Sequence, residues 1–296
     1  MKELDTSVSV EQKLHFTALG QQVEFFMKRD DLIHPFISGN KWRKLKYYLN
    51  YAKTHNKTKL VTFGGAFSNH LLATACAGAV FGYKTKAFVR GEEIKELNHM
   101  LTLCKLYGME LEFVSREAYR QKDGLYADVT DDTLIIPEGG YGELALQGCA
   151  EIADELTQEY DYIVTAVGTG ATLAGLAKGA AVKQPNCKIV GICALKGAEY
   201  LNKEIQDLIP DLTNWEVLHN YHHGGYAKTT PELIAFLKAF TAQTGVLIDP
   251  VYTAKTAYAI TDLFKQNYFK PNSKVLMLHT GGLIGLMSEK FIKTLG

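Results

Sequence analysis

The residues from Gly39 to Leu45 combine the features of an amine that can attack a carbonyl. Their sequence is Gly-Asn-Lys-Trp-Arg-Lys-Leu, and Gly-Asn is typical of a turn that starts a helix. Lys41 shares the edge of the apolar helical stripe that follows with Leu45 and Tyr48. An amine held at a helix start beside apolar and cationic groups should have a lowered pKa. A lysine with a lowered pKa can form a Schiff base with a carbonyl compound.

The same segment has a second interpretation. Lys41, Arg43, Lys44 and Lys46 lie within one and a half turns of a helix. Most charged side chains of globular proteins lie in water. On spacing alone the segment is then a solvated basic face, and Lys41 has no chemical task.

A glycine loop after an apolar strand predicts a phosphate site. Glycines let backbone amides approach an anion, the start of a helix favours negative charge, and threonine hydroxyls can donate. A nucleoside triphosphate is excluded because no Lys-Ser or Lys-Thr pair follows, and a dinucleotide is disfavoured because Leu173 replaces the third glycine of its fingerprint. A single phosphate fits better, and a turn that only packs a helix is the alternative. This phosphate loop consists of Gly168, Thr169, Gly170, Ala171 and Thr172.

Three further loops place polar side chains after a predicted strand or just before a predicted helix. Ser68-Asn69-His70 follows Gly64-Gly65, Tyr252 lies in Asp249-Pro250-Val251-Tyr252, and Thr280 precedes Gly281-Gly282. Each has a plain structural alternative, since Ser, Asn and Thr often only cap a helix and a tyrosine is often a core residue. Loops of this kind that converge on one crevice would form a ligand site.

Composition bounds the class of protein. The chain has 296 residues, 47% of them hydrophobic, and Lys+Arg and Asp+Glu both number 32. Zero formal net charge gives no support to a nucleic acid or an anionic membrane as partner, and no apolar run approaches the roughly 20 residues of a membrane span. The five cysteines are widely spaced and no metal-ligand motif occurs, so we expect free thiols, no metal and a cytoplasmic location.

Apolar, β-branched runs alternate with helical patterns, which predicts an α/β fold of doubly wound, mostly parallel sheets. The predicted strands are Lys59–Phe63, Thr85–Val89, Leu111–Val114, Thr133–Ile136, Tyr162–Val167, Lys188–Cys193 and Lys274–His279. The predicted helices after the Lys41 segment are Ser68–Phe81, Leu97–Tyr107, Leu144–Thr157, Thr172–Ala181, Pro231–Thr244 and Thr256–Asn267.

Taken together, these motifs resemble those of a family of pyridoxal-phosphate enzymes. It is the family of D-cysteine desulfhydrase and 1-aminocyclopropane-1-carboxylate deaminase, whose fold type is shared with tryptophan synthase β. The resemblance runs from Lys28 to Gly282. The motifs that carry it are Lys28-Arg29-Asp30-Asp31, Gly39-Asn40-Lys41 with Arg43-Lys44-Leu45, Ser68-Asn69-His70, Asp249-Pro250-Val251-Tyr252 and His279-Thr280-Gly281-Gly282.

The resemblance implies pyridoxal phosphate as cofactor and a role for each motif. Lys41 would bind the cofactor as a Schiff base and later remove the α-proton, Lys44 and the phosphate loop would hold its phosphate, and Asn69 its ring oxygen. Thr280 would meet the pyridine nitrogen. The residues implied to face the substrate are Ser68, Asn69, His70, Tyr226 and Tyr252, with Ser68 and the two tyrosines also placed among the catalytic residues.

Two positions bear on the reaction. Deaminases of the family resemble one another in having Glu after the tyrosine and Leu before the paired glycines, where this chain has Thr253 and Thr280. The resemblance therefore implies β-elimination from D-cysteine or a similar small amino acid, giving pyruvate, sulfide and ammonia. The ring-opening deaminase, which gives 2-oxobutyrate and ammonia, is the first alternative. A non-catalytic protein that binds a phosphate-bearing ligand is the second.

The resemblance also implies how the chain is organised. A small α/β domain, residues 51–142, would be inserted into a large cofactor-binding domain formed by residues 1–50 and 143–296. The cofactor would lie in the crevice between them, and the protein would be a homodimer.

Overall fold

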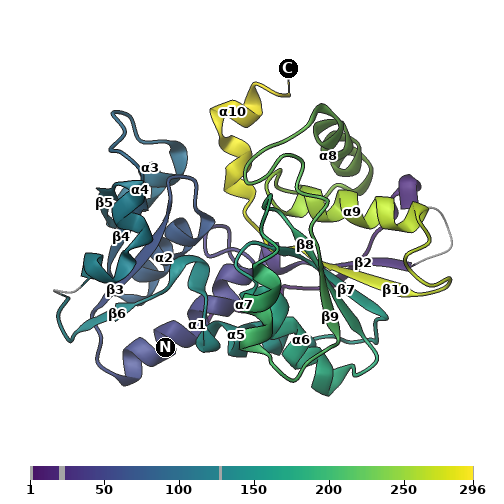
Figure 1. The fold of residues 1–296 in the computed structure, drawn as a ribbon, viewed down its shortest axis with the longest axis horizontal. Helices are drawn as coiled ribbons and strands as arrows, with labels where there is room; N and C mark the ends of the chain where they lie inside the picture. The colour runs from purple at the N-terminus through teal and green to yellow at the C-terminus, as the bar shows by residue number, and fades with distance from the viewer. Residues whose placement is uncertain (1–2, 20–23, 127–128, 296) are drawn as a thin grey trace.

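The fold contains two sheets that lie side by side (Figure 1). The computed structural model describes residues 3–19, 24–126 and 129–295. The larger sheet has the order β1-β2-β10-β7-β8-β9, and the smaller has the order β5-β4-β3-β6. All neighbouring strands run parallel except β1 and β2. The strands are β1 (Glu11–Lys13), β2 (Glu24–Lys28), β3 (Lys59–Gly65), β4 (Lys84–Arg90), β5 (Glu110–Val114), β6 (Thr133–Ile135), β7 (Tyr162–Val167), β8 (Lys188–Cys193), β9 (Trp215–Leu218) and β10 (Lys274–Leu278).

Helices cover both faces of the larger sheet. Every residue of β7 is buried, as a parallel strand with helices on both sides requires. One apolar cluster joins the sheet to α1, α5, α6 and α7, and a second joins it to α8 and α9. These helices are α1 (Asn40–Thr54), α5 (Glu143–Asp154), α6 (Ala171–Lys183), α7 (Leu201–Leu208), α8 (Pro231–Thr244) and α9 (Thr253–Lys265).

The smaller sheet is covered in the same way. The helices α2 (Asn69–Phe81) and α3 (His99–Leu106) share one apolar cluster with β4. On the other face, α4 (Arg116–Arg120) brings Tyr119 against Phe63 and Phe88. Short 3-10 turns complete the chain at η1 (Thr17–Leu19), η2 (Asp30–Leu32), η3 (Lys122–Tyr126), η4 (Glu138–Gly140) and η5 (Leu283–Met287), before α10 (Glu289–Ile292).

The predicted fold class is confirmed, and each of the seven predicted strands is present. Strands β1, β2 and β9 were not predicted, nor was helix α7. The helix predicted to reach Thr157 ends at Asp154 instead. The chain turns away there because the backbone and hydroxyl of Thr157 both donate hydrogen bonds to the Glu11 carboxylate, at 2.7 and 2.9 Å.

The strands of the two sheets come from different parts of the chain. All strands of the smaller sheet lie between residues 59 and 135, and all strands of the larger sheet lie outside that range. The domain bounds themselves stay a prediction. Within residues 3–19, 24–126 and 129–295, no helix combines the length and the apolar character that a membrane span needs.

Candidate active site

The carboxyl ends of strands from both sheets open onto one cavity of about 670 Å³. The phosphate loop, the Ser68 loop, the Tyr252 turn and the Thr280 loop all contribute to its lining, so these four segments do meet at one cavity. The predicted site residues that line the cavity are Lys41, Lys44, Ser68, Asn69, His70, Gly168, Thr169, Gly170, Thr172, Tyr226, Tyr252 and Thr280. Ala171 is the exception, because its side chain is fully buried in the core at the first turn of α6.

Lys41 stands in the first turn of α1, on the cavity side. Its Nζ lies 3.2 Å from Oδ1 of Asn40 and has no other hydrogen bond among the described residues. Burial, with a smaller contribution from the Lys44 charge, lowers the pKa of Lys41 to about 7. A large share of the amine is therefore neutral near pH 7. The interpretation of this segment as a solvated basic face is wrong, since Arg43 and Lys44 are only 1% and 3% exposed.

The phosphate loop meets Lys44 at the start of α6. Gly170 has a left-handed conformation and no side chain caps the helix, so the amides of its first turn stay free to bind a ligand. The Lys44 Nζ donates to the carbonyl of Gly139 at 3.0 Å and lies 3.4 Å from Oγ1 of Thr169. No carboxylate pairs with this buried ammonium in the described part of the chain. A buried cation without a counter-charge, beside free helix amides, forms an anion site.

The loop after β3 presents Ser68, Asn69 and His70 to the cavity. Ser68 caps α2 by accepting a hydrogen bond from the amide of Leu71 at 3.4 Å. His70 is buried, and burial together with the charges of Lys41 and Lys44 lowers its pKa well below the usual value. The imidazole is therefore neutral at physiological pH.

The tautomer of His70 follows from its neighbour. The hydroxyl of Thr62 donates to the carbonyl of Ile136 at 2.9 Å, so it accepts a hydrogen bond from Nε2 of His70 at 2.8 Å. The proton is then on Nε2, and Nδ1 is an acceptor. Among the described residues this Nδ1 has no partner, so it is available to a donor on a ligand.

Two tyrosines form a pair on the large-sheet side. The ring centroids of Tyr226 and Tyr252 lie 6.1 Å apart in an edge-to-face arrangement. Gly168 makes room for Tyr252, because a Cβ there would lie 3.2 Å from the Tyr252 ring. Burial raises the pKa of both phenols. Both therefore stay protonated at neutral pH and can act as proton donors.

Asp249 fixes the turn that carries Tyr252. Its buried carboxylate accepts hydrogen bonds from the amides of Val251, Tyr252 and Thr253 at 2.8–3.0 Å, and from the Thr253 hydroxyl at 2.9 Å. Thr253 is fully buried and does not line the cavity. The residue after the tyrosine thus acts on the shape of this turn, and not on a ligand directly.

The loop around Thr280 is interlocked with the start of α1. A Cβ at Gly39 would lie 2.1 Å from the carbonyl oxygen of Thr280, and one at Gly281 would lie 2.0 Å from Oγ of Ser38. Both glycines have positive φ values, +58° and +76°, which other residues rarely adopt. The close contact of these backbones fixes Thr280 relative to Lys41.

A buried ion cluster anchors α1 from behind. Arg43 donates to Asp30 through Nε at 3.1 Å and Nη2 at 2.8 Å, and to Glu155 at 2.5 and 2.8 Å. Lys28 also pairs with Glu155, at 3.1 Å. The end of β2, the start of α1 and the end of α5 are thus tied together. Within the motif Lys28-Arg29-Asp30-Asp31, Lys28 and Asp30 belong to this cluster, and Arg29 pairs with Asp31 at 2.7 Å.

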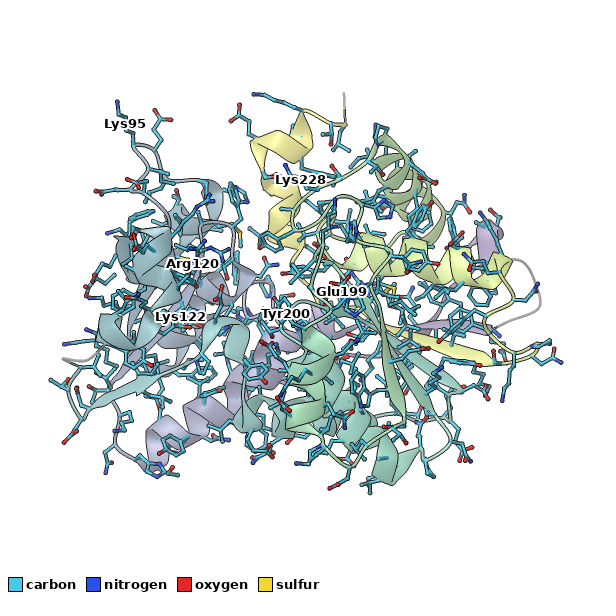
Figure 2. The ribbon with its side chains drawn as sticks, in the orientation of Figure 1. Lys95, Arg120, Lys122, Glu199, Tyr200 and Lys228 are labelled. Atoms are coloured by element: carbon cyan, nitrogen blue, oxygen red, sulfur yellow. The ribbon has the colours of Figure 1, made fainter. Side chains whose placement is uncertain are left out.

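Several residues of the cavity were not predicted. Arg90, Lys122 and Glu138 line it from the small sheet, and Tyr200 and Glu204 from α7 and the residue before it. Figure 2 shows Lys122 and Tyr200 on opposite sides of the gap between the two sheets. A signal for Arg90 existed in the sequence, because it directly follows the predicted strand Thr85–Val89.

The adjacent histidines lie outside the cavity. Nδ1 of His222 accepts the amide of Gly224 at 2.9 Å, and the His223 ring contacts the hydroxyl of Thr230 at 3.1 Å. His222 therefore acts within its own loop, whereas His223 also packs edge-to-face on the Tyr258 ring of α9, with ring centroids 4.7 Å apart.

Comparison with known proteins identifies the family. The family described as pyridoxal-phosphate dependent enzyme matches residues 10–281. A Thermotoga maritima protein named as a candidate 1-aminocyclopropane-1-carboxylate deaminase is 35% identical across 89% of this chain and 90% of its own. A Klebsiella pneumoniae D-cysteine desulfhydrase is 30% identical across 90% of this chain and 88% of its own. The crystal structure of an ACC deaminase homologue is 28% identical and superposes with a TM-score of 0.85. The match covers 97% of this chain and 93% of that chain. The chain belongs to this family of pyridoxal-phosphate dependent enzymes.

The residues of the cavity fit the cofactor of this family. Pyridoxal phosphate carries one phosphate and one aldehyde. The unpaired Lys44 ammonium and the uncapped start of α6 supply an anion site for one phosphate. Lys41, with its pKa lowered to about 7, supplies a neutral amine for an aldehyde. Both groups face the same cavity.

Proposed function

We propose that this enzyme catalyses β-elimination from D-cysteine or a similar small amino acid. One D-cysteine and one water would give one sulfide, one ammonia and one pyruvate. In this proposal Lys41 bonds the aldehyde of pyridoxal phosphate, and Lys44 with the phosphate loop, Gly168–Thr172, holds the phosphate. Asn69 binds the ring oxygen and Thr280 meets the ring nitrogen.

When bound, the cofactor draws electrons from the α-carbon of an attached amino acid and so makes its proton acidic. Residues of the chain bind the substrate and transfer the protons. The free backbone amides at the start of α2, with the Ser68 hydroxyl, bind the α-carboxylate, because a helix start favours an anion. The Lys41 amine takes the α-proton, since a base works best with a pKa near the working pH. A phenol of Tyr226 or Tyr252 gives a proton to the departing sulfur.

The observation that favours elimination over ring opening is the presence of a hydroxyl group, that of Thr280, at this position. The carboxylate beside the paired glycines is that of Asp249, whose side chain lies 3.7 Å from where a Cβ of Gly282 would be. Both Asp249 oxygens are already used by the Tyr252 turn. A hydroxyl does not enforce a protonated ring nitrogen, so a long-lived carbanion is disfavoured and prompt loss of a β-leaving group is favoured.

The test is a paired assay of the purified, cofactor-loaded enzyme. D-Cysteine is added with detection of sulfide and pyruvate, and 1-aminocyclopropane-1-carboxylate is added with detection of 2-oxobutyrate. We expect the higher kcat/KM with D-cysteine. Lys41→Ala should abolish turnover, while Lys46→Ala, on the same helix and paired with Glu3 and Glu151, should keep it. Full turnover by Lys41→Ala would refute the proposal.

The second candidate function is the ring-opening deaminase. It is favoured by the name of the Thermotoga maritima relative, which shares 35% of its residues with this chain. A higher kcat/KM with the cyclopropane amino acid than with D-cysteine would establish it in place of elimination.

A further inference from the structure

One cation of the cavity lacks a partner. Arg90 is the last residue of β4 and stands in register with Gly65 of β3. It lines the cavity, and among the side chains that the structure describes it forms neither an ion pair nor a hydrogen bond. Its guanidinium carbon lies 5.3 Å from the centroid of the Tyr119 ring. A ring face below the guanidinium orients it and leaves its N–H donors available to a ligand.

The neighbouring charges do not neutralise Arg90. Lys122 pairs with Glu138 at 2.5 Å and also lies 4.7 Å from the centroid of the same Tyr119 ring. Among the described residues that line this wall, Glu138 is the one acidic side chain, and Lys122 already matches it. Within the same described residues, the positive charge of Arg90 has no compensating carboxylate.

Arg90 and the Ser68 loop lie on opposite sides of the end of β3. A Cβ at Gly64 would lie 2.8 Å from Oγ of Ser68, whereas one at Gly65 would lie 3.6 Å from Nη2 of Arg90. Successive Cβ positions of a strand point to opposite faces. An anion at Arg90 is therefore distinct from a carboxylate at the start of α2.

Arg90 shares the cavity with the tyrosine pair of the large-sheet side. Burial raises the pKa of Tyr226, and the charge of Arg90 is close enough to offset part of that rise. Tyr226 lines the same cavity from the large-sheet side. An amino acid bound between the Ser68 loop and the tyrosine pair would thus extend its side chain toward Arg90.

We infer that Arg90 forms a second anion subsite, and that the enzyme prefers amino acids whose side chain carries a negative charge. A carboxylate, a sulfonate and an ionised thiol share this chemistry. The inference rests on the proposed function in one respect, the placement of the α-carboxylate at the Ser68 loop. Of the two candidate substrates, cysteine can meet the condition through its thiolate, whereas the cyclopropane amino acid has no side-chain charge.

The test is calorimetric titration of the cofactor-loaded enzyme with unreactive acids. Succinate and 3-sulfopropionate carry two anionic groups, and butyrate carries one on a chain of the same length as that of succinate. We expect at least one of the two dianions to bind about tenfold more tightly than butyrate, the effect of one partly exposed charge-assisted hydrogen bond. Tighter binding of succinate would indicate that the subsite takes a carboxylate, and tighter binding of 3-sulfopropionate would indicate that it takes a sulfonate.

Arg90→Gln should remove this preference and leave the butyrate affinity unchanged, which also shows that the variant is folded. Arg90→Lys should keep part of it. Arg120→Gln is the matched control, because Arg120 is an exposed cation of the same sheet unit that does not line the cavity. Equal affinity of all three acids for the wild type, a preference kept by Arg90→Gln, or an equal loss in Arg120→Gln would overturn the inference.

Turnover separates this inference from the proposed function. The proposed function fails if D-cysteine releases no sulfide, whatever the calorimetry gives. The subsite fails if the acids bind without regard to Arg90, even in an enzyme that releases sulfide.

Discussion

The substitution Asp30→Asn tests whether the buried ion cluster holds α1, and with it Lys41 and Lys44, in place. Asp30 is fully buried and accepts two hydrogen bonds from Arg43, at 2.8 and 3.1 Å, and one from Ser9 at 2.6 Å. Asparagine keeps the size of the side chain and removes its charge. Its amide cannot accept both guanidinium donors on two oxygens.

The expected loss of stability depends on the partner that Arg43 retains in the variant. Removing the single partner of a buried charge costs about 3–5 kcal/mol. Arg43 is 1% exposed but retains Glu155, whose side chain is 25% exposed and lies at 2.5 and 2.8 Å. The free energy of unfolding should therefore fall by about 2–3 kcal/mol, below the full cost of an isolated buried charge.

The assay is equilibrium unfolding in urea, followed by far-UV circular dichroism at one pH, with the same slope required for both proteins. Glu151→Gln is the matched control, because Glu151 pairs with Lys46 of the same helix at a partly exposed site. It should cost less than about 1 kcal/mol. If Asp30→Asn were no more destabilising than Glu151→Gln, the cluster would not hold α1.

Three further predictions concern the cofactor and the core. The rate at which the cofactor-free protein captures pyridoxal phosphate should rise with pH through about 7 and then level off, because the amine of Lys41 is already neutral above that pH; a rise that continues toward pH 10, as for an ordinary lysine of pKa 10.5, would contradict the burial argument. Lys44→Gln should weaken cofactor binding about tenfold or more, measured by absorbance titration, while Lys46→Gln leaves it unchanged. Gly148→Ala should lower the unfolding free energy by about 1–3 kcal/mol, because its Cβ would lie 1.8 Å from the carbonyl oxygen of Arg43; an unchanged urea midpoint would refute this.

Most of the fold could be predicted because parallel strands with helices on both faces are almost wholly apolar. The run Tyr162–Val167 shows this, and all of it is buried. The strands that escaped prediction lack this signal. β1 has three residues, none of them buried, and β9 has four that are all only partly buried. β2 is more apolar, yet it is only five residues long and a charged motif begins at its last residue.

Much of the site could be predicted for a different reason, since glycine loops after parallel strands must meet at one edge. This argument brings Ser68, the phosphate loop and Thr280 toward one cavity without any structure, whereas Lys41 and Tyr252 are placed there only by the resemblance to a known family. It does not find pairs of side chains from distant segments. The saturation of Asp249 by its own turn and the unpaired state of Arg90 depend on which groups lie within about 3 Å, and spacing along the chain does not encode that distance.

The order of strands in the larger sheet has a consequence for the synthesis of the enzyme. β10 lies between β2 and β7, so a growing chain has no neighbour for β2 on that side until Lys274–Leu278 has left the ribosome. The loop that carries Thr280, interlocked with Gly39, follows directly. A nascent chain therefore holds Lys41 on a helix whose supporting strand is unpaired along one edge for most of translation. We expect the cofactor to be captured only after this last strand has been added.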